Sequence, residues 1–176
     1  IKRLSTFHPE RPMPKIFRLV KNGKLIEGVY EGETLNTPSM FCVADALDSL
    51  MWIKEIGGLT ETIRRSNENF KCLQGWVDKT PWIENLVSDP RNRSNTSVCL
   101  KFSDERLISL IPDEKTRFVK EFVALLEAEN AAFDIKGHRN APPGLRIWCG
   151  ATINLDDIQK LLPWLEYCFH EIISSY

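Results

Sequence analysis

The chain has 176 residues, of which 43% are hydrophobic and 27% are charged, and its formal net charge is −1. This length and composition are typical of one globular domain or slightly more, and they exclude disordered and collagen-like proteins. A net charge this close to zero gives no general attraction to nucleic acid, and the sequence has no apolar run of about 18 residues that could span a membrane.

The five cysteines are odd in number, widely spaced and without a C-x-x-C pair. This pattern predicts neither a disulfide framework nor a zinc site. We therefore expect no metal and a cytoplasmic protein. We also expect all five thiols to be buried as small apolar side chains, namely Cys42, Cys72, Cys99, Cys149 and Cys168.

Residues 1–38 differ in composition from the rest of the chain. Residues 1–24 contain seven Lys or Arg and one Glu, and prolines at 9, 12, 14 and 38 with glycines at 23, 28 and 32 favour extended and turn structure. A short strand is expected at residues 15–20 and a turn at 21–24. The segment has too few apolar groups to fold alone. Its basic part is either a solvated extension, a piece that docks on an acidic surface, or an arm that binds a polyanion.

From residue 39 onward the pattern becomes that of a folded domain, which we place at residues 39–176. Helices are expected from Ser39 to the glycines at 57 and 58, at 59–78, at 114–130 and from Asn154 to the end. The first has an apolar stripe at positions 43, 46, 47, 50 and 51. Strands are expected at 82–87, 97–102, 133–135 and 145–149. This order predicts an α/β fold of the α+β kind, in which helices cover a mixed, mainly antiparallel sheet.

No complete active site is recognisable among the motifs. Of the three histidines, His8 gives no spacing signal and His170 is expected on a helix surface. The segment 136–140, K-G-H-R-N, begins a proline-containing loop, and Arg146 follows on the next strand. Because a guanidinium binds carboxylate or phosphate through a planar fork, these cations form either an anion-binding site or an internal ion pair.

A second candidate precedes the first helix. Asn36 and Thr37 stand directly before Pro38 and Ser39 and offer donors to an anion. The alternative is that this segment is an ordinary helix cap.

Four stretches, taken together and in order, resemble phosphoserine aminotransferase. They are E-G-E-T-L-N-T-P-S-M at residues 31–40, R-S-N-T-S-V-C-L at 93–100, and G-H-R at 137–139 with G-L-R-I-W-C-G at 144–150. The similarity covers nearly the whole chain. It is greatest to the alphaproteobacterial and archaeal-like branch of this class V, pyridoxal-phosphate-dependent family.

The resemblance implies a role for each candidate residue. Asn36 and Thr37 would contact the cofactor phosphate of the neighbouring subunit. His138 and Arg139 would hold the substrate phosphate, also across a homodimer, and Arg146 would bind the substrate α-carboxylate. The fold would be the C-terminal small domain of a fold-type I enzyme, with residues 1–38 as the tail of the large cofactor domain and a dimer contact.

The implied enzyme transfers the amino group of glutamate to 3-phosphohydroxypyruvate, which gives phosphoserine and 2-oxoglutarate in L-serine biosynthesis. The family's Schiff-base lysine and the aspartate that pairs with the pyridine nitrogen would lie upstream of Ile1. No catalytic residue is therefore expected in this chain, and the chain alone is expected to be inactive. The alternatives are a standalone anion-binding module without catalysis and another class V transaminase with a different substrate.

Overall fold

The structure, a computed structural model, describes residues 2–6, 10–11 and 14–176. His8, Pro9 and Pro12 lie outside the described residues. The chain divides into two compact units, Ile1–Trp52 and Ile53–Tyr176, and each is described by itself. The predicted domain division between residues 38 and 39 stays a prediction.

The first unit consists of short elements joined by turns. They are α1 (Lys2–Thr6), η1 (Lys15–Phe17), β1 (Val20–Lys21), β2 (Lys24–Leu25) and η2 (Glu27–Tyr30). Strands β1 and β2 pair antiparallel around Asn22 and Gly23, whose φ angles of 52° and 74° are those of a two-residue hairpin turn. The predicted turn is confirmed. The predicted strand at 15–20 is wrong for 15–17, which form a 3-10 turn.

Helix α2 (Met40–Glu55) starts where the sequence predicts, and the Ser39 hydroxyl accepts a hydrogen bond from the Cys42 amide at 3.5 Å. None of its residues is buried. Leu47 and Leu50, two members of the predicted apolar stripe, are 56% and 63% exposed. Periodicity correctly identifies residues that share a face, but the described residues of the first unit leave that face exposed.

Helix α3 (Gly58–Val77) follows directly. Gly57 and Gly58 have φ angles of 117° and 74°, a region that side chains disfavour, so the chain can end one helix and begin another there. The C-terminal half of α3 enters a core through Leu73 and Val77. Leu59, at its start, is exposed.

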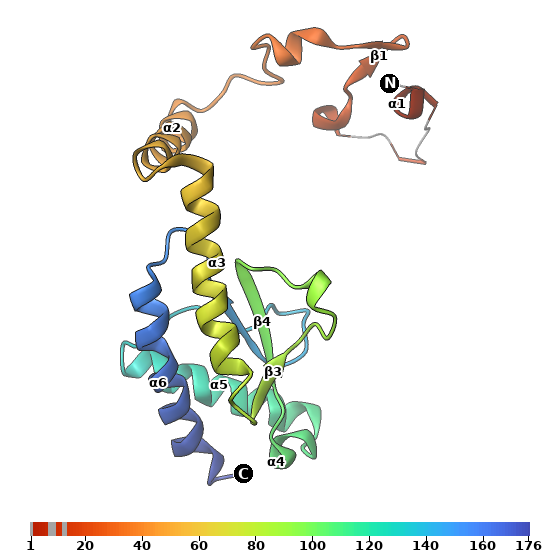
Figure 1. The fold of residues 1–176 in the computed structure, drawn as a ribbon. Helices are drawn as coiled ribbons and strands as arrows, with labels where there is room; N and C mark the ends of the chain where they lie inside the picture. The colour runs from red at the N-terminus through yellow and green to blue at the C-terminus, as the bar shows by residue number, and fades with distance from the viewer. Residues whose placement is uncertain (1, 7–9, 12–13) are drawn as a thin grey trace. The chain divides into compact units, whose positions relative to one another are not determined.

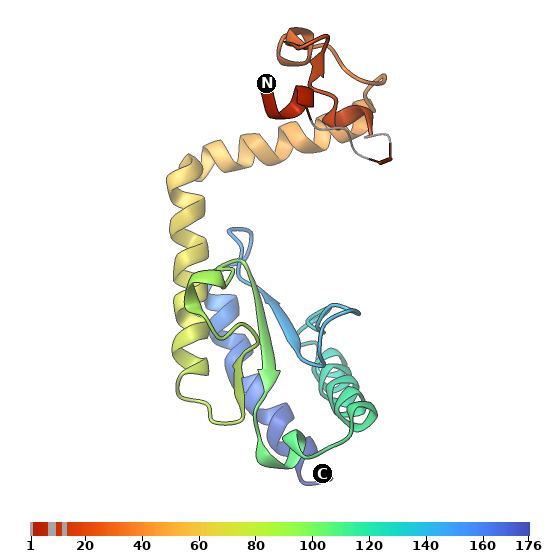
Figure 2. The ribbon, with the colours of Figure 1, turned by 90° about the vertical axis from the view of Figure 1, so that its right-hand side faces the viewer.

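The second unit contains a three-stranded antiparallel sheet in the order β3-β4-β5. Its strands are β3 (Ile83–Asn85), β4 (Ser97–Phe102) and β5 (Leu145–Trp148), and its further helical elements are η3 (Pro90–Asn92), α4 (Glu105–Ile108), α5 (Pro112–Ala128) and α6 (Leu155–Ile173). Helix α6 lies beside both α3 and α5 (Figures 1 and 2). The fold class predicted from the sequence is confirmed.

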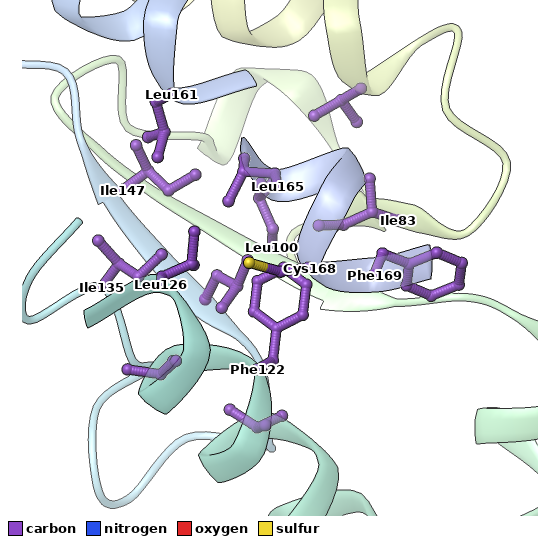
Figure 3. Packing of buried hydrophobic residues seen from close by; sticks show 14 of the residues in the cluster. Ile83, Leu100, Phe122, Leu126, Ile135, Ile147, Leu161, Leu165, Cys168 and Phe169 are labelled. Atoms are coloured by element: carbon purple, nitrogen blue, oxygen red, sulfur yellow. The ribbon is translucent and has the colours of Figure 1, made fainter. Parts of the chain in front are cut away.

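The core lies between these helices and one face of the sheet. Figure 3 shows Phe122 and Leu126 of α5 and Leu165 of α6 gathered around Leu100 and Ile147 of the sheet. Burying each such side chain contributes about 1.5–3 kcal/mol. Trp82 stacks on Phe169 with ring centroids 4.0 Å apart. These contacts explain how a sheet of only three short strands is held in a stable layer.

Side chains alternate between the two faces of the sheet, and the face away from the core, here called the open face, is less buried. Register pairs Val98 with Ile147 on the core face and Cys99 with Arg146 on the opposite face. Trp148 is 52% exposed on that open face. Its position follows from the period of two in a strand.

Two further predictions need correction. Residues 133–135 form no strand, because Asp134 has a φ of 53°, and a single bridge pairs Lys136 with Leu145. The cysteines are not all buried: Cys149 and Cys168 are, Cys72 and Cys99 are partly so, and Cys42 is exposed. All five thiols are free. Among the described residues, no helix has the length and apolarity needed to cross a bilayer.

Candidate functional site

The loop between residues 136 and 145 is closed at its base by backbone hydrogen bonds. The Gly137 amide donates to the Gly144 carbonyl at 2.8 Å, and the Arg146 amide donates to the Ile135 carbonyl at 2.7 Å. Pro142 restricts the backbone between these anchors, since its ring fixes φ. The backbone that bears Lys136, Arg139 and Arg146 is therefore constrained.

Gly144 fixes where the loop meets the sheet. A Cβ at this position would lie 2.2 Å from the carbonyl oxygen of Leu100 on β4. Only glycine permits this close approach of two backbones. The sequence therefore sets the loop directly against the central strand.

The imidazole of His138 is oriented by the loop itself. The Asn140 amide donates to His138 Nδ1 at 3.2 Å, and the Ala141 amide donates to the His138 carbonyl at 2.8 Å. Because Nδ1 accepts, the neutral ring carries its hydrogen on Nε2. His138 thus offers Nε2–H as a donor to a ligand.

His138 and Arg139 line a hollow of about 210 Å³ between the loop and helix α5. Its walls are Thr116, Val119, Lys136, Gly137, His138, Arg139, Ala141, Pro142, Pro143 and Gly144. No acidic side chain is among them. Thr116 is separated from the loop by 20 positions in the sequence, so no local pattern could have placed it here. The hollow presents positive charge without a carboxylate to neutralise it, which suits an anion.

Arg146 lies on the open face of the sheet and outside the lining of that hollow. Its side chain is 38% exposed, and its Nη2 is 3.6 Å from an Asp134 carboxylate oxygen, whose side chain is 92% exposed. An ion pair within the chain, one of the two alternatives left open by the sequence, is therefore present, and it lies on the surface. Such an exposed pair contributes about 0–1 kcal/mol, so an incoming carboxylate could replace Asp134 at little cost.

Asn36 and Thr37 belong to the first unit and are exposed between η2 and α2. The helix cap is supplied by Ser39. Neither Asn36 nor Thr37 makes a side-chain hydrogen bond with another described residue. Their amide and hydroxyl groups are the donor types that a phosphate requires, so this pair fits a cofactor phosphate.

The buried thiols and His170 lie apart from the loop and its hollow. Burial raises the pKa of the Cys149 thiol to about 12 and that of Cys168 to about 11, which keeps both unreactive at neutral pH. His170 is on the surface of α6, as predicted, 3.8 Å from Glu166. Within the described part of the chain, no group of three or more His, Cys, Asp or Glu side chains could hold a metal ion.

Comparison with known proteins identifies the relatives of this chain. No protein-family model matches it. The phosphoserine aminotransferase of Methanosarcina mazei is 43% identical over 171 residues, which are 96% of this chain and 43% of that protein. That of Methanosarcina barkeri is 43% identical over 172 residues, or 97% of this chain and 43% of that protein.

Solved structures agree on the fold. The phosphoserine aminotransferase from Bacillus circulans subsp. alkalophilus has a TM-score of 0.68 at 21% identity and matches 90% of this chain and 39% of that one. The pyridoxal-phosphate-bound enzyme from Trichomonas vaginalis has a TM-score of 0.66 at 22% identity, over 90% of this chain and 40% of that one. The fold is that of part of a fold-type I pyridoxal-phosphate enzyme. The chain is therefore a homologue of phosphoserine aminotransferase that spans 43% of the length of its two Methanosarcina relatives.

Proposed function

We propose that this chain is the C-terminal part of a phosphoserine aminotransferase subunit. The complete enzyme transfers the amino group between glutamate and 3-phosphohydroxypyruvate in L-serine biosynthesis, as a cytoplasmic homodimer. The observation that carries the proposal is the hollow lined by His138 and Arg139, which has no acidic wall. A substrate with a phosphate group explains this excess of positive charge better than a neutral one does.

Arg146 binds the α-carboxylate that both substrates share. Its guanidinium can make two parallel hydrogen bonds to a carboxylate, and its backbone is held on the edge strand β5, paired with Cys99 of the central strand β4. Asp134 is the ion-pair partner of Arg146 in this structure, and the substrate carboxylate takes its place.

His138 and Arg139 bind the substrate phosphate in the neighbouring subunit of the dimer. Their hollow does not include Arg146, which is consistent with the two groups serving different active sites. His138 contributes Nε2–H, and Arg139 contributes charge and a planar donor set.

Asn36 and Thr37 hold the phosphate of pyridoxal phosphate bound in the neighbouring subunit. When bound, this cofactor withdraws electrons from the α-carbon of the amino-acid substrate. The lysine that attaches the cofactor lies in the part of the subunit that precedes these residues. The 176-residue chain alone is therefore inactive, and mixing it with cofactor and glutamate is expected to give no turnover.

Single-turnover kinetics of the two half-reactions in the full-length dimer test the proposal. Arg146→Lys keeps the charge but loses the fork, so kcat/KM with both glutamate and phosphoserine is expected to fall by roughly 30- to 1000-fold, or about 2–4 kcal/mol. Arg139→Ala is expected to impair the phosphoserine half-reaction and leave the glutamate half-reaction mostly intact.

A matched control is Lys120→Gln, which removes an exposed cation of α5 that does not line the hollow. Its kinetics should equal those of the wild type. Equal losses with glutamate and phosphoserine for Arg139→Ala, or unchanged glutamate kinetics for Arg146→Lys, contradict the assignment. Transamination of other amino acids without phosphoserine turnover would favour a class V transaminase with a different substrate.

A further inference from the structure

The base of the loop carries a third cation, Lys136, in the wall of the hollow that His138 and Arg139 line. Its backbone is paired with Leu145, and the next amide, that of Gly137, donates to Gly144. Lys136 and His138 are two positions apart, and both contribute to the same wall. The lysine therefore projects from a fixed point of the loop.

The surroundings of Lys136 do not neutralise its charge. Among the described residues it has no ion-pair partner, whereas Lys101 pairs with Glu84 at 3.0 Å and Lys160 pairs with Asp156 at 2.5 Å. Lys136 and Arg139 both line this hollow, and no carboxylate lines it. An anion that enters the hollow would therefore meet two cations without competition from a neighbouring acidic side chain.

The charge in the hollow suits a phosphate monoester better than a carboxylate. A phosphate monoester carries about −1.5 to −2 charges at pH 7 and has three acceptor oxygens, whereas a carboxylate carries one charge. Thr116 is not a ready donor to it, because its hydroxyl already donates to the Pro112 carbonyl at 2.9 Å. Lys136, Arg139 and the Nε2–H of His138 then provide donors for all three phosphate oxygens.

We propose that Lys136 is a specificity residue that binds the phosphate group of the substrate together with His138 and Arg139. This inference rests on the proposed aminotransferase function and deepens it. The ammonium group of Lys136, on its flexible side chain, attracts the phosphate by its charge. His138, whose ring the loop orients, donates a hydrogen bond in a defined direction. Lys136 thereby favours the phosphorylated substrate over glutamate.

The test compares Lys136→Gln, Lys136→Arg and the control Lys120→Gln in the full-length enzyme. Lys136→Gln is expected to lower kcat/KM for phosphoserine by roughly 10- to 100-fold, the range for one hydrogen bond to a charged group, mainly through KM. Glutamate kcat/KM should change by less than about twofold. Lys136→Arg should restore most of the loss, because it keeps the charge.

A binding measurement gives a second readout that does not depend on turnover. Isothermal titration with inorganic phosphate should show weaker binding for Lys136→Gln than for Lys120→Gln, at equal melting temperatures. Wild-type phosphoserine kinetics and phosphate binding in Lys136→Gln, beside a selective loss in Arg139→Ala, would overturn the role of Lys136 and leave the proposed function standing. A wild-type enzyme that does not use phosphoserine would overturn both.

Discussion

Replacing Glu166 with alanine is expected to destabilise the second unit, because this carboxylate joins α6 to α3 and to the chain before β3. Its Oε1 accepts from the Trp76 indole N–H at 2.8 Å, and its Oε2 accepts from that of Trp82 at 3.3 Å. The Thr80 hydroxyl, 3.4 Å away, keeps a better acceptor in the Trp76 carbonyl at 2.8 Å. The two indoles are therefore the hydrogen-bond donors that lose their partner, and the exposed contact with His170 at 3.8 Å adds little.

The magnitude follows from the burial of those indoles. Trp82 is only 5% exposed, so its N–H would be left without an acceptor at a cost of about 1–3 kcal/mol. Trp76 is partly exposed, and water can replace part of its lost bond. We expect Glu166→Ala to lower the free energy of unfolding by about 2–3 kcal/mol. At roughly 2–4 °C per kcal/mol, the melting temperature should fall by about 5–10 °C.

Urea unfolding of the 176-residue chain, followed by tryptophan fluorescence and circular dichroism, measures this loss. Glu171→Ala is the matched control, because Glu171 is exposed on the same helix and its side chain has no hydrogen-bond partner among the described residues. Glu166→Gln should lose about 1 kcal/mol, since its amide oxygen can still accept from one indole. Equal stabilities of the Glu166→Ala and Glu171→Ala variants would refute the reasoning.

Three further changes test other contacts. Gly144→Ala should lower the free energy of unfolding by about 1–3 kcal/mol, measured by thermal unfolding, and should weaken phosphate binding. The reason is that the alanine Cβ would lie 2.2 Å from a β4 carbonyl oxygen and would displace the loop. Unaltered stability would contradict that close approach. Hydrogen bonds from Arg106 hold the pKa of Asp104 below its usual range, so its stabilisation is present above about pH 4 and is lost as pH falls through the lower, folded-state pKa. Asp104→Asn should therefore lose less than about 1 kcal/mol at pH 7, and urea unfolding at acid pH should show that difference shrinking. Asn69→Ala should cost about 1–3 kcal/mol, measured by thermal unfolding, because its buried amide donates to a carbonyl before α6 at 2.9 Å; a wild-type melting temperature would rule that contribution out.

Local sequence signals were sufficient for most secondary structure. Strand β4 occupies Ser97–Phe102, as its alternation predicts, and α6 begins after Asn154, whose amide donates to Asp157 at 3.3 Å. Turns at Asn22 and Gly57 are encoded by residues that tolerate positive φ. These features depend on neighbours within a few positions, so a single sequence contains the information for them.

Features that depend on residues far apart in the sequence were harder to predict from the sequence. Periodicity in α2 identifies a shared apolar face that includes Leu47 and Leu50, yet both side chains are exposed. The spacing of apolar residues shows which of them share a face of a helix, but it does not show what packs against that face. The apolar context of Cys42 likewise suggested burial that the fold does not provide. Residues 133–135 have strand composition, but Asp134 turns the backbone out of the sheet.

The candidate site combines both kinds of information. The sequence by itself determined the identity and order of Asn36, Thr37, His138, Arg139 and Arg146, through motifs that resemble one enzyme family. Only the tertiary structure decided that Arg146 projects from the open sheet face, and that helix α5 closes the hollow beside the loop. Register and helix packing set these positions through contacts between segments far apart in the chain, and no local pattern specifies such contacts.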